Sequence, residues 1–187
     1  AKKLGAQIEY CGEHCLEVIT PKILDTTVPQ GTGEKSRTSF MFSAPLLVRQ
    51  GHAIVPIPGG DKLGVRPLDR LFDCFSQMGI STEITENQII FNTDKIKPTH
   101  YTFTKPSHTV TETILMVAAF ADGQTILDNS AQEPEIDDLI SMLNDMGAQI
   151  HRDSNDLKRI IIDGFKTLSG TKHQVICDRN EIITFAC

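Results

Sequence analysis

The pattern of apolar and polar positions predicts two kinds of helix. Residues 39–51 and 111–123 are apolar on nearly every side, which is typical of helices that are buried all round. Pro45 lies in the first of them and is expected to kink it or to limit its first turns. A helix with one apolar face is predicted to begin at Pro67, because proline is favoured at a first helical position. Its apolar face consists of Leu68, Leu71, Phe72, Phe75 and Met78.

Short apolar and β-branched runs between these helices predict strands. Residues 53–56 and 124–127 each follow a buried helix and lead into a helix with one apolar face. A run at residues 100–105 precedes the second buried helix, and a similar run at residues 174–178 precedes a helix that is predicted to begin at Arg179. Further strands are predicted at residues 7–10, 15–19, 82–84, 88–91, 149–151 and 159–162.

These elements recur with a period of about 70 residues, which indicates an internal repeat. A Leu-Gly or Met-Gly pair stands at Gly5, Gly79 and Gly147, where a helix is predicted to end in a left-handed glycine cap. The repeating unit is strand, buried helix, strand, surface helix, strand, strand. We expect one truncated domain over 1–187, with units at approximately 1–20 (partial), 37–97, 98–165 and 172–187 (partial).

The repeat places the chain in the α/β class. A unit of about 70 residues is longer than those of helical solenoids, and it has fewer strands than a propeller requires if every unit is one blade. Helices that are apolar all round, repeated between strands, indicate helices enclosed by sheets.

Composition and charge narrow the possible functions. The chain has 40% hydrophobic residues, enough for a core, and a net charge of −6, which argues against a nucleic-acid surface. The run at residues 114–121 is far shorter than the ~20 residues that span a bilayer, and the N-terminus shows no signal-peptide pattern. Because the chain begins on a helix end without Met, we interpret it as a fragment. An odd number of cysteines without a secretory signal favours the cytoplasm.

The five cysteines predict neither a metal site nor a cofactor. Cys74 falls on the apolar face of the helix after Pro67 and is expected in the core. Cys11 and Cys15 lie close to His14, but a metal site needs about four ligands, and no partner cluster is present in the sequence. The remaining thiols are Cys177 and Cys187.

The segment from Pro56 to Pro67 is a glycine-rich connection between a strand and a helix. Glycines allow backbone to approach a ligand, and Arg66 lies where a helix N-terminus already favours anions. On spacing alone, a simple connection with glycine turns and solvated charges explains the segment equally well.

The motif Pro-Gly-Gly-Asp-x-x-Gly-x-Arg-Pro at residues 58–67 resembles the mobile active-site loop of UDP-N-acetylglucosamine enolpyruvyltransferases. The resemblance extends over roughly the whole chain. It implies an inverse α/β barrel, and a reaction that transfers enolpyruvate from phosphoenolpyruvate to the 3′-hydroxyl of UDP-N-acetylglucosamine with release of phosphate. This step commits the nucleotide sugar to peptidoglycan, and so to cell-wall growth, cell shape and division.

The same resemblance implies catalytic roles for Asp61 and Arg66. Asp61 stands where the family has a reactive cysteine linked to proton delivery and product release. A carboxylate is a poor nucleophile toward soft electrophiles, so we expect the protein to be insensitive to the thiol-directed epoxide fosfomycin.

Substrate-binding roles follow from the other matching positions. The residues implied are Arg37, Arg66, Pro67, Leu68, Asp69, Arg70, Lys105, Ser107, His108 and Thr109. Arg70, His108 and Thr109 depart from the family pattern, which has leucine, an apolar residue and glycine there. Glu133 and Glu135 match a Glu-Pro-Glu segment, and we interpret both as acidic residues that favour a helix N-terminus.

The expected partners are the two small-molecule substrates and a second domain of the same enzyme, with no nucleic acid and no membrane. A Lys-Asn pair, the base aspartate and an arginine of the other domain are absent from the sequence, so the fragment is expected to be inactive alone. The alternatives are 5-enolpyruvylshikimate-3-phosphate synthase and a catalytically dead relative that binds nucleotide sugars. An RNA-end-processing enzyme on similar repeats is disfavoured by the acidic balance.

Overall fold

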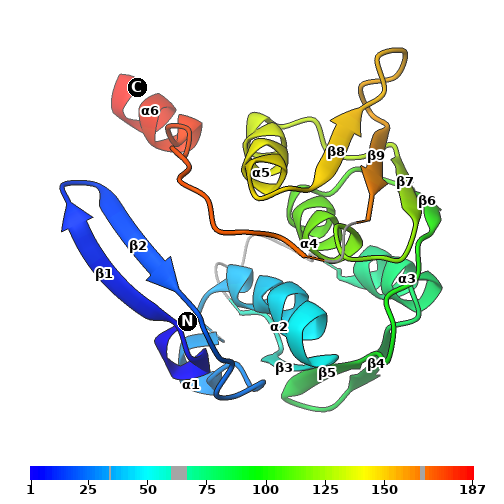
Figure 1. Ribbon diagram of the computed structural model, residues 1–187, viewed down its shortest axis with the longest axis horizontal. Coiled ribbons are helices and arrows are strands. Elements are labelled where there is room, and N and C mark those ends of the chain that lie inside the picture. Colours follow the sequence, from blue (N-terminus) through cyan, green and yellow to red (C-terminus); the bar gives the residue numbers. More distant parts are fainter. Residues whose placement is uncertain (34, 60–66, 165–166) are drawn as a thin grey trace.

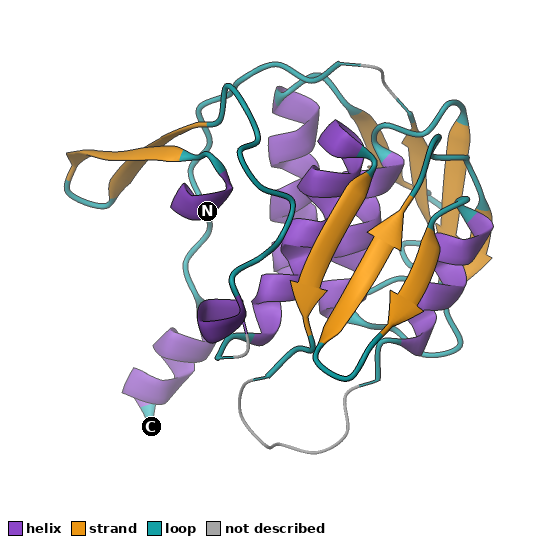
Figure 2. Ribbon diagram, turned by 90° about the horizontal axis from the view of Figure 1, so that it is seen from below, coloured by secondary structure: helices purple, strands orange, loops and turns teal. Residues whose placement is uncertain are grey.

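Two sheets with helices between them form most of the molecule (Figures 1 and 2). The computed structural model describes residues 1–33, 35–59, 67–164 and 167–187. The helices are η1 (Lys2–Leu4), α1 (Gln30–Gly33), η2 (Arg37–Phe42), α2 (Ser43–Gln50), α3 (Asp69–Gln77), α4 (His108–Ala118), α5 (Pro134–Asp145) and α6 (Arg179–Ala186). The strands are β1 (Gln7–Gly12), β2 (Cys15–Ile19), β3 (His52–Pro56), β4 (Ser81–Ile84), β5 (Gln88–Asn92), β6 (His100–Thr102), β7 (Gln124–Asp128), β8 (Gln149–Arg152) and β9 (Ile160–Asp163).

The two larger sheets share one topology. The first has the order β3-β5-β4, and the second has the order β6-β7-β9-β8. In the second sheet β6 runs parallel to β7, whereas β7 and β8 are both antiparallel to β9. The first sheet repeats this arrangement, because β3 and β4 are antiparallel to β5 and a parallel bridge joins Thr27 to Ile54 of β3. Thr27 therefore occupies the place that β6 has in the other sheet.

Helices α2 and α4 are enclosed between the sheets, as their composition predicts. Ala44 and Leu47 of α2 and Ile114 and Leu115 of α4 are at most 1% exposed. The buried Thr113 hydroxyl of α4 is paired within the helix, since it donates to the Thr109 carbonyl at 2.7 Å. The two enclosed helices pack against each other, and the Thr113 hydroxyl remains paired.

Pro45 has the predicted effect on the first buried helix. Residues Arg37–Phe42 form a 3-10 helix and the α-helical part begins at Ser43, two residues before the proline. Proline lacks the N–H that an interior helical position needs, so it is tolerated only in this first turn. The buried helix is therefore divided into two segments.

Glycine ends the helices that lead into paired strands. Gly5, Gly79 and Gly147 have φ angles of 112°, 78° and 107°, which confirms the predicted left-handed caps. The apolar face of α3 is also confirmed, since Phe75 is fully buried and its ring meets that of Phe91 edge-on at 5.4 Å.

The structure corrects two of the predicted helix boundaries and one predicted strand. Helix α3 begins at Asp69, so Pro67 precedes the helix instead of opening it. Helix α4 begins three residues earlier than expected and ends at Ala118. The predicted strand at residues 174–178 is wrong: this segment has no strand partner among the described residues, and Val175 is 73% exposed. A β-branched run forms a strand only where a neighbouring strand can pair with it.

The chain ends in α6, which begins at Arg179 as predicted. The Asp178 carboxylate accepts hydrogen bonds from the N–H groups of Asn180 and Glu181 and caps this helix. Residues 167–178 form an extended segment that passes the central helices and leads into α6 (Figure 1). None of the helices in the described parts of the chain is both long and apolar enough to cross a membrane.

Gly51→Ala should destabilise the fold far more than Gly79→Ala. Both glycines have left-handed φ angles, 67° and 78°, which cost any alanine about 1 kcal/mol. At Gly51 a Cβ would also lie 2.5 Å from the Thr93 carbonyl oxygen, whereas at Gly79 the nearest atom is 3.3 Å away. The clash should bring the loss for Gly51→Ala to about 3 kcal/mol in urea unfolding. Equal losses for the two variants would contradict this packing.

Candidate functional site

The two enclosed helices run in the same direction. The end of α2 (Val48 and Gly51) and the residues after α4 (Phe120 and Asp122) line one surface cavity of about 470 Å³. The C-terminal ends of α2 and α4 therefore meet there, while the helices pack along each other and η2 also contacts α4. It follows that the N-terminal ends, with Arg37 and the residues before His108, lie together at the opposite side.

The start of α4 is built to attract an anion. Ser107 is the N-cap in extended conformation, and its side chain makes no capping hydrogen bond within the described structure. His108 and Thr109 are the first helical residues, so their N–H groups have no partner within the helix. Lys105 is exposed just before this end. Unpaired N–H groups, the helix dipole and a cation together favour a phosphate or carboxylate.

His108 connects this helix end to two carboxylates. Its Nδ1 lies 3.5 Å from Glu112 Oε2, one turn along α4, and its Nε2 lies 3.6 Å from Glu135 Oε2 in the first turn of α5. Glu135 also accepts a hydrogen bond from Arg179 Nε at 2.8 Å. His108, Glu135 and Arg179 thereby link the N-terminal ends of α4, α5 and α6 in one polar network.

The pKa values of the two carboxyl groups in this network are shifted in opposite directions. Burial raises the pKa of Glu112, an effect that the nearby His108 opposes and that Glu135 reinforces. The hydrogen bond from Arg179 lowers the pKa of Glu135 and holds that carboxyl in its charged form. Glu135 does lie in the first turn of α5, as predicted, but its charge is also engaged by Arg179.

Arg37 opens η2 at the same side. Its guanidinium carbon lies 6.0 Å from the centre of the Phe40 ring, and Phe40 is fully buried. A cation held over an aromatic ring keeps its charge while its position is restrained. Arg37 is thus a partly exposed cation anchored to the core at the start of a buried helix.

The stretch from Pro67 to Arg70 forms the entry to α3. Leu68 is the N-cap and is only 8% exposed, and its carbonyl accepts hydrogen bonds from the N–H groups of Leu71 and Phe72. Because the Leu68 side chain lies in the core, a ligand at this position would contact the backbone of Leu68. Pro67 and Asp69 are exposed.

Arg70 is directed toward the interior side of α3. Burial, together with Asp73, raises the pKa of Tyr101 to about 12, and the Arg70 charge partly opposes this shift. Arg70 therefore acts electrostatically on a tyrosine of β6, which its replacement of a leucine did not predict. The two predicted catalytic residues, Asp61 and Arg66, lie outside the described residues.

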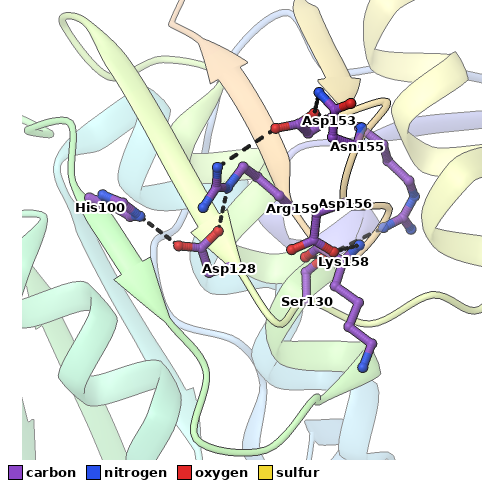
Figure 3. Close-up of polar contacts among 9 residues, drawn as sticks. His100, Asp128, Ser130, Asp153, Asn155, Asp156, Lys158 and Arg159 are labelled. Carbon is purple, nitrogen blue, oxygen red and sulfur yellow. Dashed lines mark hydrogen bonds and ion pairs between the residues drawn. The ribbon is translucent and has the colours of Figure 1, made fainter.

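A second polar network, which the sequence analysis missed, crosses the larger sheet (Figure 3). Asp128 at the end of β7 lies 2.7 Å from His100 Nε2 and 2.6 Å from Arg159 Nε. Arg159 also lies 3.6 Å from Asp153 Oδ2. The Arg159 hydrogen bond, followed by that of His100, holds the pKa of Asp128 below its ordinary value. These groups join β6 and β7 to the connection between β8 and β9, and their contacts with one another support the sheet.

The spacing of residues in the sequence predicts few of the contacts in either polar network. His108 and Glu112 are four residues apart, so their contact on one helix could have been found from the sequence. Glu135, Arg179 and the Asp128 network join residues far apart in the chain, which only the fold brings together. Among the residues that the structure describes, no group of three or more His, Cys, Asp or Glu side chains is placed to hold a metal ion.

The whole chain, residues 1–187, matches the family described as EPSP synthase (3-phosphoshikimate 1-carboxyvinyltransferase). The chain belongs to this family, and the resemblance seen in the sequence is confirmed. Two solved structures share the fold: the enolpyruvyl transferase NikO from Streptomyces tendae (TM-score 0.78, 18% identity, 98% of this chain and 43% of that one) and EPSP synthase from Acinetobacter baumannii (TM-score 0.68, 20% identity, 93% and 39%). The predicted α/β fold of the enolpyruvyltransferases is therefore correct.

Curated relatives point to one branch of the family. UDP-N-acetylglucosamine 1-carboxyvinyltransferase of Elusimicrobium minutum is 39% identical over 97% of this chain and 42% of its own length. UDP-N-acetylglucosamine 1-carboxyvinyltransferase 2 of Carboxydothermus hydrogenoformans is 40% identical over 98% of this chain and 43% of its own length. The chain thus spans less than half the length of the relatives it resembles.

Asp128→Asn should lower the free energy of unfolding by about 1–2 kcal/mol at pH 7, because it removes the charge that Arg159 and His100 share. The folded-state pKa of Asp128 is depressed, so this stabilisation is present above the unfolded-state value of ~3.9 and is lost as the pH falls through the lower folded-state value. Urea unfolding of both proteins between pH 7 and strongly acidic pH tests this. The exposed Asp94→Asn serves as control. A difference that stays constant down to the lowest pH would contradict the assignment.

Proposed function

We propose that this chain forms the part of a UDP-N-acetylglucosamine enolpyruvyltransferase that carries the Pro-Gly-Gly loop. The reaction transfers enolpyruvate from phosphoenolpyruvate to the 3′-hydroxyl of the nucleotide sugar and releases phosphate. The names of the relatives at 39–40% identity support this substrate. So does the loop motif at residues 58–67, whose own structure lies outside the described part of the chain.

One observation carries the proposal: the N-terminal ends of the enclosed helices open together on one side, with cations beside them. Phosphoenolpyruvate and the diphosphate of the nucleotide are both polyanions. Arg37 at the start of η2 and Lys105 before α4 supply fixed positive charge there. Serine and helical N–H groups at Ser107, His108 and Thr109 supply hydrogen-bond donors.

In this proposal the residues divide the work of an addition followed by an elimination. Arg37, Arg66 and Lys105 hold the anionic groups, while Pro67, Leu68, Asp69 and Arg70 form the backbone and side-chain wall of the nucleotide site. Asp61 delivers a proton to C3 of the enol, which requires that loss of water raise its pKa from about 3.9. Arg66 stabilises the charge that remains on the carboxylate and phosphate.

A second domain completes the site in this proposal. The base that accepts the hydroxyl proton and a further arginine come from that domain, so residues 1–187 alone bind substrate weakly and do not turn it over. The step belongs to peptidoglycan synthesis in the cytoplasm, and so to cell-wall growth and division.

One alternative substrate has support of its own. The description of the matching family names 3-phosphoshikimate, and one of the similar solved structures is an EPSP synthase. Shikimate 3-phosphate is also an anion, so the same helix ends would suit it. The alternative of a catalytically dead relative rests on the departures from the family pattern at Asp61, Arg70 and Thr109. Binding without phosphate release would support the dead relative, and a response only to shikimate 3-phosphate would support the sister enzyme.

Lys105→Gln should weaken binding of UDP-N-acetylglucosamine by roughly tenfold, the loss expected for one charge-assisted contact. Titration calorimetry on the full-length protein that carries residues 1–187 measures it. Lys95→Gln is the matched control, because Lys95 is an exposed lysine by the cavity at the opposite helix ends. Equal effects of the two lysine variants would contradict the placement of the site.

His108→Val restores the apolar residue of the family pattern. It should leave the affinity for UDP-N-acetylglucosamine within about threefold of the natural protein.

Asp61→Cys should make the full-length protein sensitive to fosfomycin, whereas the natural protein should be unaffected by it. A thiolate attacks the epoxide, and a carboxylate at the same position does so far more slowly. Mass spectrometry of the treated proteins reports one added inhibitor at Cys in the variant only. Labelling of Asp61 in the natural protein, or none in the variant, would argue against the proposed role of this position.

A further inference from the structure

The hairpin of β1 and β2 carries two thiols in direct contact. The Sγ atoms of Cys11 and Cys15 are 2.6 Å apart, and both residues are exposed to solvent. This separation is shorter than an ordinary N–H···O hydrogen bond of about 2.9 Å, although sulfur is the larger atom. Little movement would be needed to bring the two sulfurs to bonding distance.

The local backbone explains why the thiols meet. Tyr10 pairs with Leu16 and Gly12 pairs with Cys15, so Cys11 is the extra residue of a β-bulge. In a bulge two residues of one strand oppose a single residue of the other, which places both Cys11 and Gly12 opposite Cys15. His14, with φ at 59°, closes the turn between them. The contact is therefore built by the fold of the hairpin, in addition to the short spacing in sequence.

A covalent link would affect the stability of this hairpin. It forms a separate two-stranded sheet that projects from the rest of the molecule (Figure 1). Its apolar side chains are open to solvent, with Tyr10 84% and Val18 58% exposed. An isolated two-stranded hairpin is at best marginally stable in water, so a covalent link across its end would restrict its opening.

We propose that Cys11 and Cys15 are a disulfide-exchange site that low-molecular-weight disulfides oxidise reversibly. One thiolate attacks the disulfide RSSR, which releases one RSH and leaves a mixed disulfide on the protein. The second thiolate then attacks the protein sulfur of that mixed disulfide and releases the second RSH. The Cys11–Cys15 bond forms, two protein thiols are oxidised, and one RSSR is reduced to two RSH. This site is independent of the proposed transferase activity.

The other cysteines provide internal controls. Cys74 is fully buried, and burial raises the pKa of its thiol to about 12, so it is inert. Cys177 and Cys187 are exposed, and neither touches a second thiol within the described structure. Their reaction should stop at the mixed disulfide. This difference distinguishes a thiol that is merely exposed from the two thiols that lie in contact.

The test is treatment of the folded protein with oxidised glutathione, followed by tryptic digestion without reduction. The peptide of residues 4–22 holds Cys11 and Cys15 and none of the other cysteines. We expect it to lose two hydrogen masses and to carry no glutathione, while the peptides with Cys177 and Cys187 gain glutathione. Cys15→Ser should leave Cys11 with bound glutathione. Reduction should restore the original masses.

Two further measurements keep the proposal falsifiable. Hydrogen exchange of the amides in residues 7–19 should slow in the oxidised protein and should not change in Cys15→Ser after the same treatment. The bridge should also form faster in the folded protein than in urea. Glutathione on both Cys11 and Cys15 without a bridge, or equal rates with and without urea, would overturn the proposal.

Discussion

The enclosure of two parallel helices between two sheets is the constraint on which the rest of the structure depends. Most apolar side chains of α2 and α4 are buried, so both sheets are needed to remove these side chains from water. Helices that share a direction also share a positive end. The chain cannot bury these helices in this way without presenting several unpaired N–H groups on one side of the molecule.

Typical interaction free energies indicate which groups would contribute most to binding an anion at these helix ends. One exposed helix N-terminus contributes about 0.3–1 kcal/mol, whereas a hydrogen bond to a charged group contributes about 1.5–3 kcal/mol. In the proposed site, the side chains of Arg37 and Lys105 would therefore contribute more to the affinity for an anion than the helix ends do. This local balance explains how a chain with a net charge of −6 can present a site for anions. Arg179 offsets the charge of Glu135 in the same way.

The sequence predicted the elements whose causes are local. The caps at Gly79 and Gly147 need only a residue that adopts a left-handed conformation. The burial of the two enclosed helices follows from their apolar composition. The strand expected at residues 174–178 failed because strand formation depends on a partner, which local pattern does not reveal. The contact of Glu135 with Arg179 was missed for the same reason, since 44 residues separate them. The roles of the site residues remain predictions, and those of Asp61 and Arg66 rest on the motif alone.

The most direct test of the account is phosphate release from phosphoenolpyruvate by the full-length protein that carries residues 1–187. Release that depends on UDP-N-acetylglucosamine, and that is unchanged when shikimate 3-phosphate is added, is the predicted result. Phosphate release that needs shikimate 3-phosphate instead, or none with either acceptor, would contradict the proposed function.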